Sequence, residues 1–280
     1  MSQSTFGKKF TVTTWGESHG KALGTVVDGV PAGLFLTEAD IQTYLDRRKP
    51  GQSRYTTARN EGDEVEILSG IFEGQTTGTP ISMIVRNKDQ RSRDYGNIAQ
   101  TYRPGHADFG FDSKYGFRDY RGGGRSSGRE TIGRVAAGAI AAKILKELGI
   151  TLQAYTRSIG PVSCHSYHPE VIKENSFYMP DMVAAEKASQ YLEQCMKEED
   201  SAGGVIECRI NGVPAGIGDP VFGKLDAAFA QALMSIGAVK AVGIGDGIKV
   251  STMKGSEDND GFHMENGRIV KTTNHSGGIL

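Results

Sequence analysis

Gly29-Val30-Pro31-Ala32-Gly33 recurs letter for letter as Gly212-Val213-Pro214-Ala215-Gly216, and this repeated pentapeptide decides the predicted fold. Each copy follows a run rich in β-branched and aliphatic residues that predicts a strand, at Leu23–Val27 and at Val205–Ile210. Chance repetition is the alternative. The shared structural context favours an internal duplication, and we therefore predict one pseudo-symmetric domain over residues 1–280.

A helix is predicted after each pentapeptide. In the first copy Thr37 can cap the helix with Asp40 reaching back, and the helix ends at Arg47-Arg48-Lys49 before Pro50. In the second copy the helix spans Leu225–Ile236. Other predicted strands are Phe10–Thr14, Val65–Leu68 and Ile81–Arg86; other predicted helices run from a Ser127–Glu130 capping box to Leu148 and from Met182 to Lys197. Residues 254–269 are predicted to be a loop.

Composition points to a globular protein with a substantial core, because 38% of the residues are hydrophobic and 23% charged. No apolar run approaches the roughly 20 residues of a membrane helix, and the polar N-terminus has no signal-peptide core. Cys164, Cys195 and Cys208 have no paired metal spacing, which suits reduced thiols. We therefore expect a soluble, cytoplasmic protein without a membrane partner or a metal site.

Positive charge gathers in one stretch although the net charge is −1. Between Arg47 and Arg134 there are 16 basic and 11 acidic residues. A local excess in a neutral chain favours a site for a small polyanion over a nucleic-acid surface. Aromatic residues are also not interleaved with the basic ones, so no nucleic-acid partner is expected.

The run Gly122-Gly123-Gly124-Arg125-Ser126-Ser127-Gly128-Arg129 has the residue types that a phosphate requires. Glycines allow close approach, a helix start offers free N–H groups, and arginines and hydroxyls add donors. It is neither a dinucleotide fingerprint nor a P-loop. A flexible, well-capped turn is the alternative. Cys164-His165-Ser166-Tyr167-His168 imitates a metal cluster but lacks a fourth ligand, and we reject it.

Arginines and histidines elsewhere could serve the same anion. Arg48, Arg54, Arg103 and Arg129 are candidates for a bidentate grip on carboxylate or phosphate, although each could be a solvated surface charge. His19 and His106 both lie in glycine-flanked turns. Histidine beside phosphate-binding arginines suits general acid catalysis, but a merely structural or exposed histidine is equally compatible with the spacing.

Several motifs give the chain a resemblance to the chorismate synthase family. The matching segments are Gly16–Gly20 followed by Val27–Pro31, Asp46–Arg48, Asp89-Gln90-Arg91-Ser92, Tyr102–Asp108, Arg125–Thr131 and Asn274–Gly278. The similarity runs from residue 6 to the last residue. It implies an α/β (α+β) sandwich with helices packed between antiparallel sheets, assembled as a homotetramer.

The resemblance also implies an activity. The family converts 5-enolpyruvylshikimate 3-phosphate to chorismate and phosphate, an anti-1,4-elimination that requires reduced FMN. His19 would protonate the departing phosphate, and His106 would stabilise the reduced flavin. Arg48, Arg54, Arg103 and Arg129 would hold the substrate. Arg125, Ser126, Ser127, Gly237, Ala238 and Gly278 would bind FMN, and Arg48 and Arg54 are linked to NADPH in members that reduce their own flavin.

Two family segments do not occur in the 280 residues: a Lys-Pro-Thr segment that grips FMN and an Arg-His-Asp-Pro motif. We therefore expect a C-terminally truncated chain with weak FMN binding and little turnover. Two other functions remain as alternatives, a flavin oxidoreductase with net electron transfer and a non-catalytic module that binds the substrate phosphate.

Overall fold

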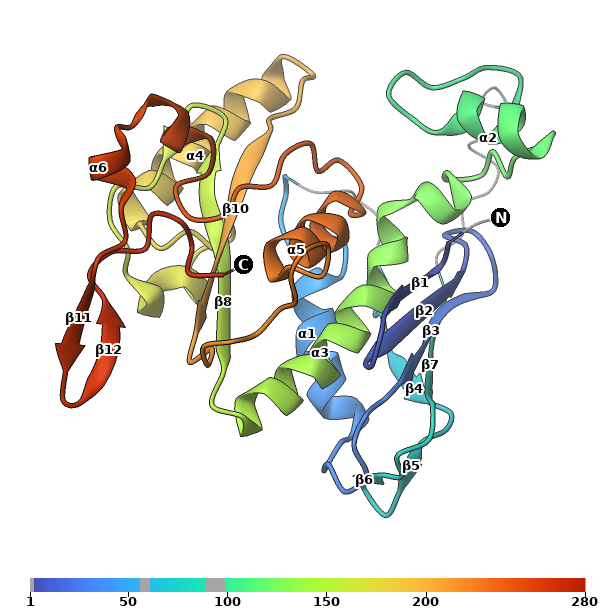
Figure 1. Ribbon diagram of the computed structural model, residues 1–280. Coiled ribbons are helices and arrows are strands. Elements are labelled where there is room, and N and C mark those ends of the chain that lie inside the picture. Colours follow the sequence, from blue (N-terminus) through green and yellow to red (C-terminus); the bar gives the residue numbers. More distant parts are fainter. Residues whose placement is uncertain (1–2, 56–60, 89–98, 280) are drawn as a thin grey trace. The chain divides into compact units, whose positions relative to one another are not determined.

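The computed structural model describes residues 3–55, 61–88 and 99–279 (Figure 1). The chain divides into two compact units, Met1–Gly212 and Val213–Leu280, and each is described by itself. The prediction of a single domain stays a prediction.

A five-stranded antiparallel sheet organises the first unit (Figure 1). Its strands, in spatial order, are β1 (Thr5–Gly7), β2 (Thr11–Gly16), β3 (Ala22–Asp28), β7 (Ile81–Arg86) and β4 (Val65–Ile67). In register, Val27 lies opposite Val12 on β2 and Ile81 on β7. The predicted strands at these positions are therefore confirmed to within a few residues.

Helices α1 (Glu38–Arg48) and α3 (Thr131–Glu147) pack against each other and against the sheet. Asp40 accepts a hydrogen bond from the Thr37 backbone N–H at 2.9 Å, as the sequence predicts. At Gly133 of α3 an added Cβ would lie 2.8 Å from Thr14, so the helix can cross the sheet closely only because it has no side chain there.

The predicted capping box at the start of α3 is wrong. Ser127 does accept a hydrogen bond, from the N–H of Arg129, but it caps a short 3₁₀ turn, η4 (Gly128–Glu130), that follows another, η3 (Gly124–Ser126). The Glu130 carboxylate instead accepts hydrogen bonds from Thr14 at 2.8 Å and Arg134 at 2.8 Å. A partner on the neighbouring strand therefore replaces the local one.

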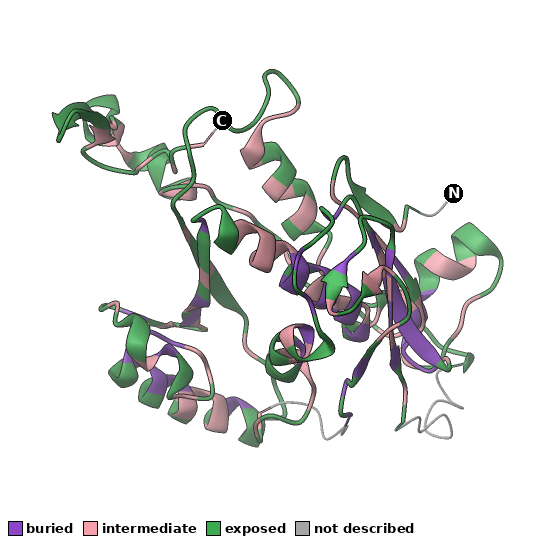
Figure 2. Cartoon of the chain, turned by 90° about the horizontal axis from the view of Figure 1, so that it is seen from below, coloured by how far each residue is buried: buried purple, intermediate pink, exposed green. Residues whose placement is uncertain are grey.

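One hydrophobic core lies between this sheet and its helices, where Figure 2 shows most of the residues coloured as buried. Its fully buried members come from both layers: Val27, Leu36, Ile41, Leu45, Ile81, Met83, Val85, Ile132 and Ile140.

A second antiparallel sheet follows α3, with the strand order β10 (Gly204–Asn211), β8 (Thr151–Ile159) and β9 (Val162–Ser163). Helix α4 (Met182–Lys197) packs beside β9 over a smaller core of Cys164, Met179, Ala184, Ala185 and Ala188. Shorter elements of this unit are β5 (Ile71–Phe72), β6 (Gln75–Thr76), α2 (Asp108–Tyr115) and η5 (Pro169–Lys173). The α+β class with antiparallel sheets is confirmed.

The second unit contains α5 (Leu225–Met234), η6 (Gly247–Thr252), α6 (Gly255–Asp258) and a hairpin of β11 (Phe262–Glu265) and β12 (Arg268–Lys271). The prediction of a loop over 254–269 is therefore wrong for most of its length. Asn266-Gly267 forms the turn, with φ of 48° and 74°, and this dipeptide is a strong hairpin signal in a sequence.

The glycines at both ends of the two pentapeptides have matching φ angles. Gly29 and Gly212 have φ of 81° and 80°, and Gly33 and Gly216 have φ of 87° and 89°. An added Cβ would lie 1.8 Å from the Lys9 carbonyl oxygen at Gly29 and 2.2 Å from the Gly149 carbonyl oxygen at Gly212. Glycine is therefore required at both positions for the same reason, which supports a duplicated strand–turn unit.

Candidate active site

His19 is held almost completely buried, with 8% of its surface exposed, in the turn between β2 and β3. The turn closes through a hydrogen bond from the Gly20 N–H to the Glu17 carbonyl, at 3.1 Å. The Ser18 hydroxyl lies 3.2 Å from Nδ1 of His19 and donates to the carbonyl of Gly122 at 3.3 Å. With its proton directed at Gly122, the Ser18 oxygen can accept from Nδ1–H, and this contact orients the imidazole.

The glycine loop 122–124 presses directly on this imidazole. All three residues have positive φ, at 63°, 84° and 53°. An added Cβ at Gly122 would lie 2.2 Å from two ring atoms of His19, and one at Gly123 would lie 3.5 Å from Nη2 of Arg103. The loop therefore brings the His19 ring and the Arg103 guanidinium to two adjacent glycines.

Arg125 fastens the same loop to the strand that leads to His19. Its guanidinium donates to the carbonyl oxygens of Thr14 at 3.2 Å and Gly16 at 3.1 Å. Ser126 is exposed, and its hydroxyl donates to the Gly123 carbonyl at 2.7 Å. The arginine and serines predicted to bind FMN thus lie beside the His19 turn and help to shape it.

One buried carboxylate, Asp63, holds two of the predicted arginines. Nη1 of Arg129 lies 3.0 Å from one oxygen of Asp63, and Arg48 bonds the other. Nε of Arg48 also donates to the Thr131 hydroxyl at 3.2 Å. The side chain of Asp63 has no exposed surface, and only 5% of the Arg129 side chain is exposed. These arginines bind protein groups here, and their predicted contact with a substrate stays a prediction.

Asn87, which follows β7, joins this cluster to the His19 turn. Its Oδ1 accepts from Nε and Nη2 of Arg129 at 3.1 and 2.8 Å. Its Nδ2 donates to the carbonyls of Glu17 at 3.1 Å and Gly20 at 2.8 Å. Neither Asn87 nor Asp63 was found from the sequence, because their partners lie 15 to 70 residues away and form no local motif.

Arg103 and His106 lie together on the turn that starts α2. Arg103 binds Asp108 through Nε and Nη2, both at 2.9 Å, and these hydrogen bonds lower the pKa of Asp108 to about 2. The backbone N–H of His106 donates to the Arg103 carbonyl at 3.2 Å, and the His106 side chain is exposed. His106 is therefore open to a ligand or to solvent, whereas His19 is enclosed.

Arg54 is placed apart from this cluster. Its Nη2 bonds the hydroxyl of Tyr55 at 2.7 Å and pairs with Glu193 on α4. The hydroxyl of Tyr55 bonds Ser189 on the same helix at 2.7 Å. The described contacts thus connect Arg54 with α4 and not with Asp63.

Gly237, Ala238 and Gly278 belong to the second unit and are described within it. Ala238 and Gly278 have positive φ, at 69° and 75°. The turn before Gly278 is held by Asp260, which accepts from the backbone N–H groups of His275 at 2.8 Å and Ser276 at 3.0 Å. The motif segment Asp89-Gln90-Arg91-Ser92 lies outside the described residues.

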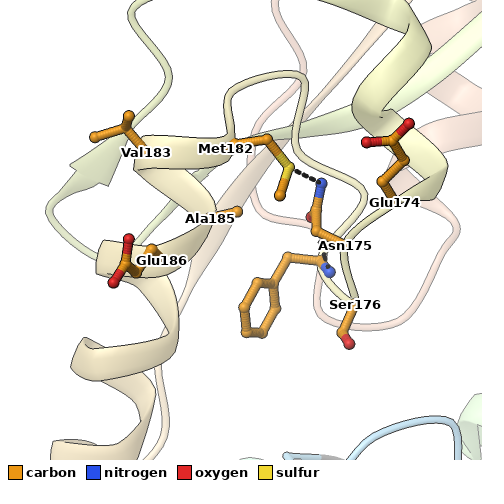
Figure 3. A pocket seen from close by; sticks show the side chains of 8 residues that line it. Glu174, Asn175, Ser176, Met182, Val183, Ala185 and Glu186 are labelled. Atoms are coloured by element: carbon orange, nitrogen blue, oxygen red, sulfur yellow. Dashed lines mark hydrogen bonds between the residues drawn. The ribbon is translucent and has the colours of Figure 1, made fainter.

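A cavity of about 440 Å³ lies elsewhere, at the start of α4 (Figure 3). Its lining contains two carboxylates and no cation, so its charge does not suit a phosphate; the lining residues are Glu174, Asn175, Ser176, Phe177, Met182, Val183, Ala185 and Glu186. Across the described parts of the chain no group of three or more His, Cys, Asp or Glu side chains could hold a metal ion. Nor does any helix in those parts have the length and apolarity to cross a membrane.

Comparison with known proteins gives one consistent result. The family model described as chorismate synthase matches residues 10–280. A chorismate synthase of Agathobacter rectalis is 64% identical over all of this chain and 77% of its own length. One of Methanocella arvoryzae is 56% identical over all of this chain and 76% of its own length. A crystal structure of chorismate synthase has a TM-score of 0.81 and 32% identity, covering 97% of this chain and 81% of that one.

The fold and these relatives define an enzyme of the lyase class. The chain belongs to the chorismate synthase family.

Proposed function

We propose that this chain catalyses the 1,4-elimination of phosphate from 5-enolpyruvylshikimate 3-phosphate, giving chorismate. The observation that carries the proposal is the enclosure of His19 by the glycine loop, within a network of arginines. As an imidazolium whose Nδ1–H is held by Ser18, His19 would keep its Nε2–H to donate to a departing phosphate.

The chain's own residues account for the electrostatic part of the reaction. Breaking the allylic C–O bond builds negative charge on the phosphate oxygen, and preorganised positive groups stabilise that charge. Arg103 stands beside the glycine loop, while Arg48 and Arg129 are fixed by Asp63. Proton transfer from His19 would then remove one negative charge from the leaving phosphate.

The residues around the loop fit a flavin phosphate or a polar flavin edge in chemical type. Ser126 is exposed, Ser127 is half-buried, and 31% of the Arg125 side chain is exposed. These residues would hold reduced FMN, and the exposed His106 would lie beside it. Gly237, Ala238 and Gly278 stay predicted FMN contacts. Reduced FMN, when bound, supplies electron density for the elimination. NADPH is the expected reductant if the protein reduces its own flavin, with Arg48 and Arg54 as the expected contacts.

The test is an anaerobic single-turnover assay with protein in excess over substrate and FMN in excess over protein. Dithionite supplies the reducing equivalents, and phosphate and chorismate are followed together. The proposal expects the two products in equal amounts. Substrate bound without phosphate release would identify a binding module. In a parallel multiple-turnover assay with NAD(P)H in place of dithionite, stoichiometric consumption of NAD(P)H with product would identify a flavin oxidoreductase.

We further propose a homotetramer in a reducing, cytoplasmic compartment. The three cysteines are free thiols, which supports the compartment. Light scattering at several protein concentrations tests the assembly, and a monomer throughout would contradict it.

A further inference from the structure

We propose that Asn87 is a positioning residue for His19, an inference that rests on the proposed function. Its Nδ2 donates to the carbonyls of Glu17 and Gly20, which are the two carbonyls that flank Ser18-His19. Its backbone N–H donates to the carbonyl of Lys21 at 3.1 Å. One residue thus holds the His19 turn at three points.

The other end of the carboxamide is equally occupied. Oδ1 accepts from two nitrogens of Arg129, and the same guanidinium reaches Asp63 through Nη1. A carboxamide has two donor hydrogens and two acceptor sites on its oxygen, and Asn87 uses all four. Its orientation is therefore determined by chemistry, because reversing it would point N–H groups at a guanidinium and oxygen at two carbonyls.

This arrangement makes one side chain the link between an expected substrate-binding arginine and the expected proton donor. If the carboxamide is lost, the carbonyls of Glu17 and Gly20 lose their partners and the turn can shift. A displacement of about 1 Å at a reacting group can reduce a rate by about 10²-fold. The hydrogen bonds of Asn87 go to backbone carbonyls of the turn and to Arg129, so its effect on His19 acts through the turn.

The experiment compares N87D and N87S with wild type in the single-turnover assay. N87D keeps the size of the side chain and the acceptor toward Arg129 but loses both donors to the turn. N87S replaces the carboxamide by one short hydroxyl. We expect both variants to lower the limiting rate by about 10²-fold, while the protein concentration at half-maximal rate changes less than about threefold. N266D, on the exposed hairpin turn, makes the same charge change and should match wild type.

Thermal unfolding separates positioning from general stability. A variant with a lowered Tm and an unchanged limiting rate per folded molecule would overturn the proposal, since Asn87 would then be structural only. An equal loss of limiting rate and of substrate affinity would also overturn the proposal, because the substitution would then act on substrate binding by Arg129 and not on His19.

A second measurement keeps the inference separate from the proposed function. The ¹⁵N resonances of the His19 imidazole, assigned by comparison with H19Q, report its tautomer and surroundings without any turnover. We expect them to shift in N87D, while those of His165, His168 and His263 stay in place. Unshifted His19 resonances would overturn the positioning role. Absence of chorismate with wild type would overturn only the function.

Discussion

Arg129 and Asp63 form a 3.0 Å ion pair in which only 5% and 0% of the two side chains are exposed. Arg48 bonds the second oxygen, so two guanidinium groups share one buried carboxylate. The backbone of Asp63 has a φ of 47°, in the left-handed region that non-glycine residues seldom occupy. Such a conformation persists where the surroundings hold it in place. Here the two arginines hold the Asp63 side chain, and Gln42 on α1 donates a hydrogen bond to the Asp63 carbonyl.

Replacing Asp63 by Asn should therefore destabilise the protein strongly. Two guanidinium groups would lose their counter-charge inside the protein, and breaking a buried pair typically costs about 3–5 kcal/mol. Urea denaturation measures this loss. E66Q, which removes an exposed carboxylate paired with Arg86 at 3.6 Å, is the matched control and should change stability by less than about 1 kcal/mol. Similar values for the two variants would show that Asp63 is not the centre of the cluster.

Removing either imidazole should lower the single-turnover rate. H19Q is expected to reduce it by about 10²–10⁴-fold, the range for a lost proton-transfer group, and H106A is expected to reduce it because His106 is proposed to stabilise the reduced flavin. H106A should leave Tm unchanged because the side chain is exposed. His168 is also exposed, on the loop before η5, and H168Q serves as the control with a wild-type rate. A wild-type rate in H19Q would exclude that imidazole from the mechanism.

A single methyl group at Gly122 should displace the His19 ring. In G122A the new Cβ would lie 2.2 Å from the ring and 2.9 Å from the Ser18 hydroxyl, on a backbone with φ of 63°. We expect a rate loss of about 10²-fold and a stability loss of about 1–3 kcal/mol. G138A is the control, because nothing lies within 4 Å of that position on α3. It should raise stability by up to about 1 kcal/mol, since alanine is the better helix former. Normal turnover by G122A would mean that the loop does not confine the imidazole.

Acid stability should depend on Asp108. Hydrogen bonds from Arg103 lower its pKa from 3.8 to about 2 in the folded protein. A lowered folded pKa gives stability that is present above pH of about 4 and is lost as the pH falls toward 2. The shift corresponds to about 2 kcal/mol, so D108N should flatten the fall in unfolding free energy across that window. E73Q, at an exposed turn, should keep the wild-type dependence of unfolding free energy on pH. An unchanged slope in D108N would show that the Arg103 pair does not contribute to folding.

Local patterns were sufficient to predict much of the fold. Strands β2, β3 and β7 and helices α1, α4 and α5 follow from alternation, periodicity and caps, all of which act within a few residues. The hairpin at Asn266-Gly267 was missed although its signal was present, because charged and polar residues around it favoured a loop. The role of Glu130 was missed for a different reason, since its partner Thr14 lies 116 positions away.

In the candidate site, too, local features could be predicted from the sequence and long-range pairings could not. Glycine-flanked histidines and the arginine-rich loop could be identified from residue types, and His19, Arg103 and Arg125 do meet at that loop. Asp63 and Asn87 could not be found, because their function comes from pairings over 66 and 42 residues with Arg129. The contact of Arg54 with Glu193, 139 positions away, is of the same kind.

Strand β10 lies at the outer edge of its three-stranded sheet, next to β8 alone among the described strands. An edge of eight residues exposes a row of backbone donors and acceptors to which another extended chain can add. Val205 and Ile206 on it are 53% and 69% exposed, while Glu207 and Arg209 place opposite charges beside them. Concentrated stocks of the purified protein are therefore expected to self-associate along this strand.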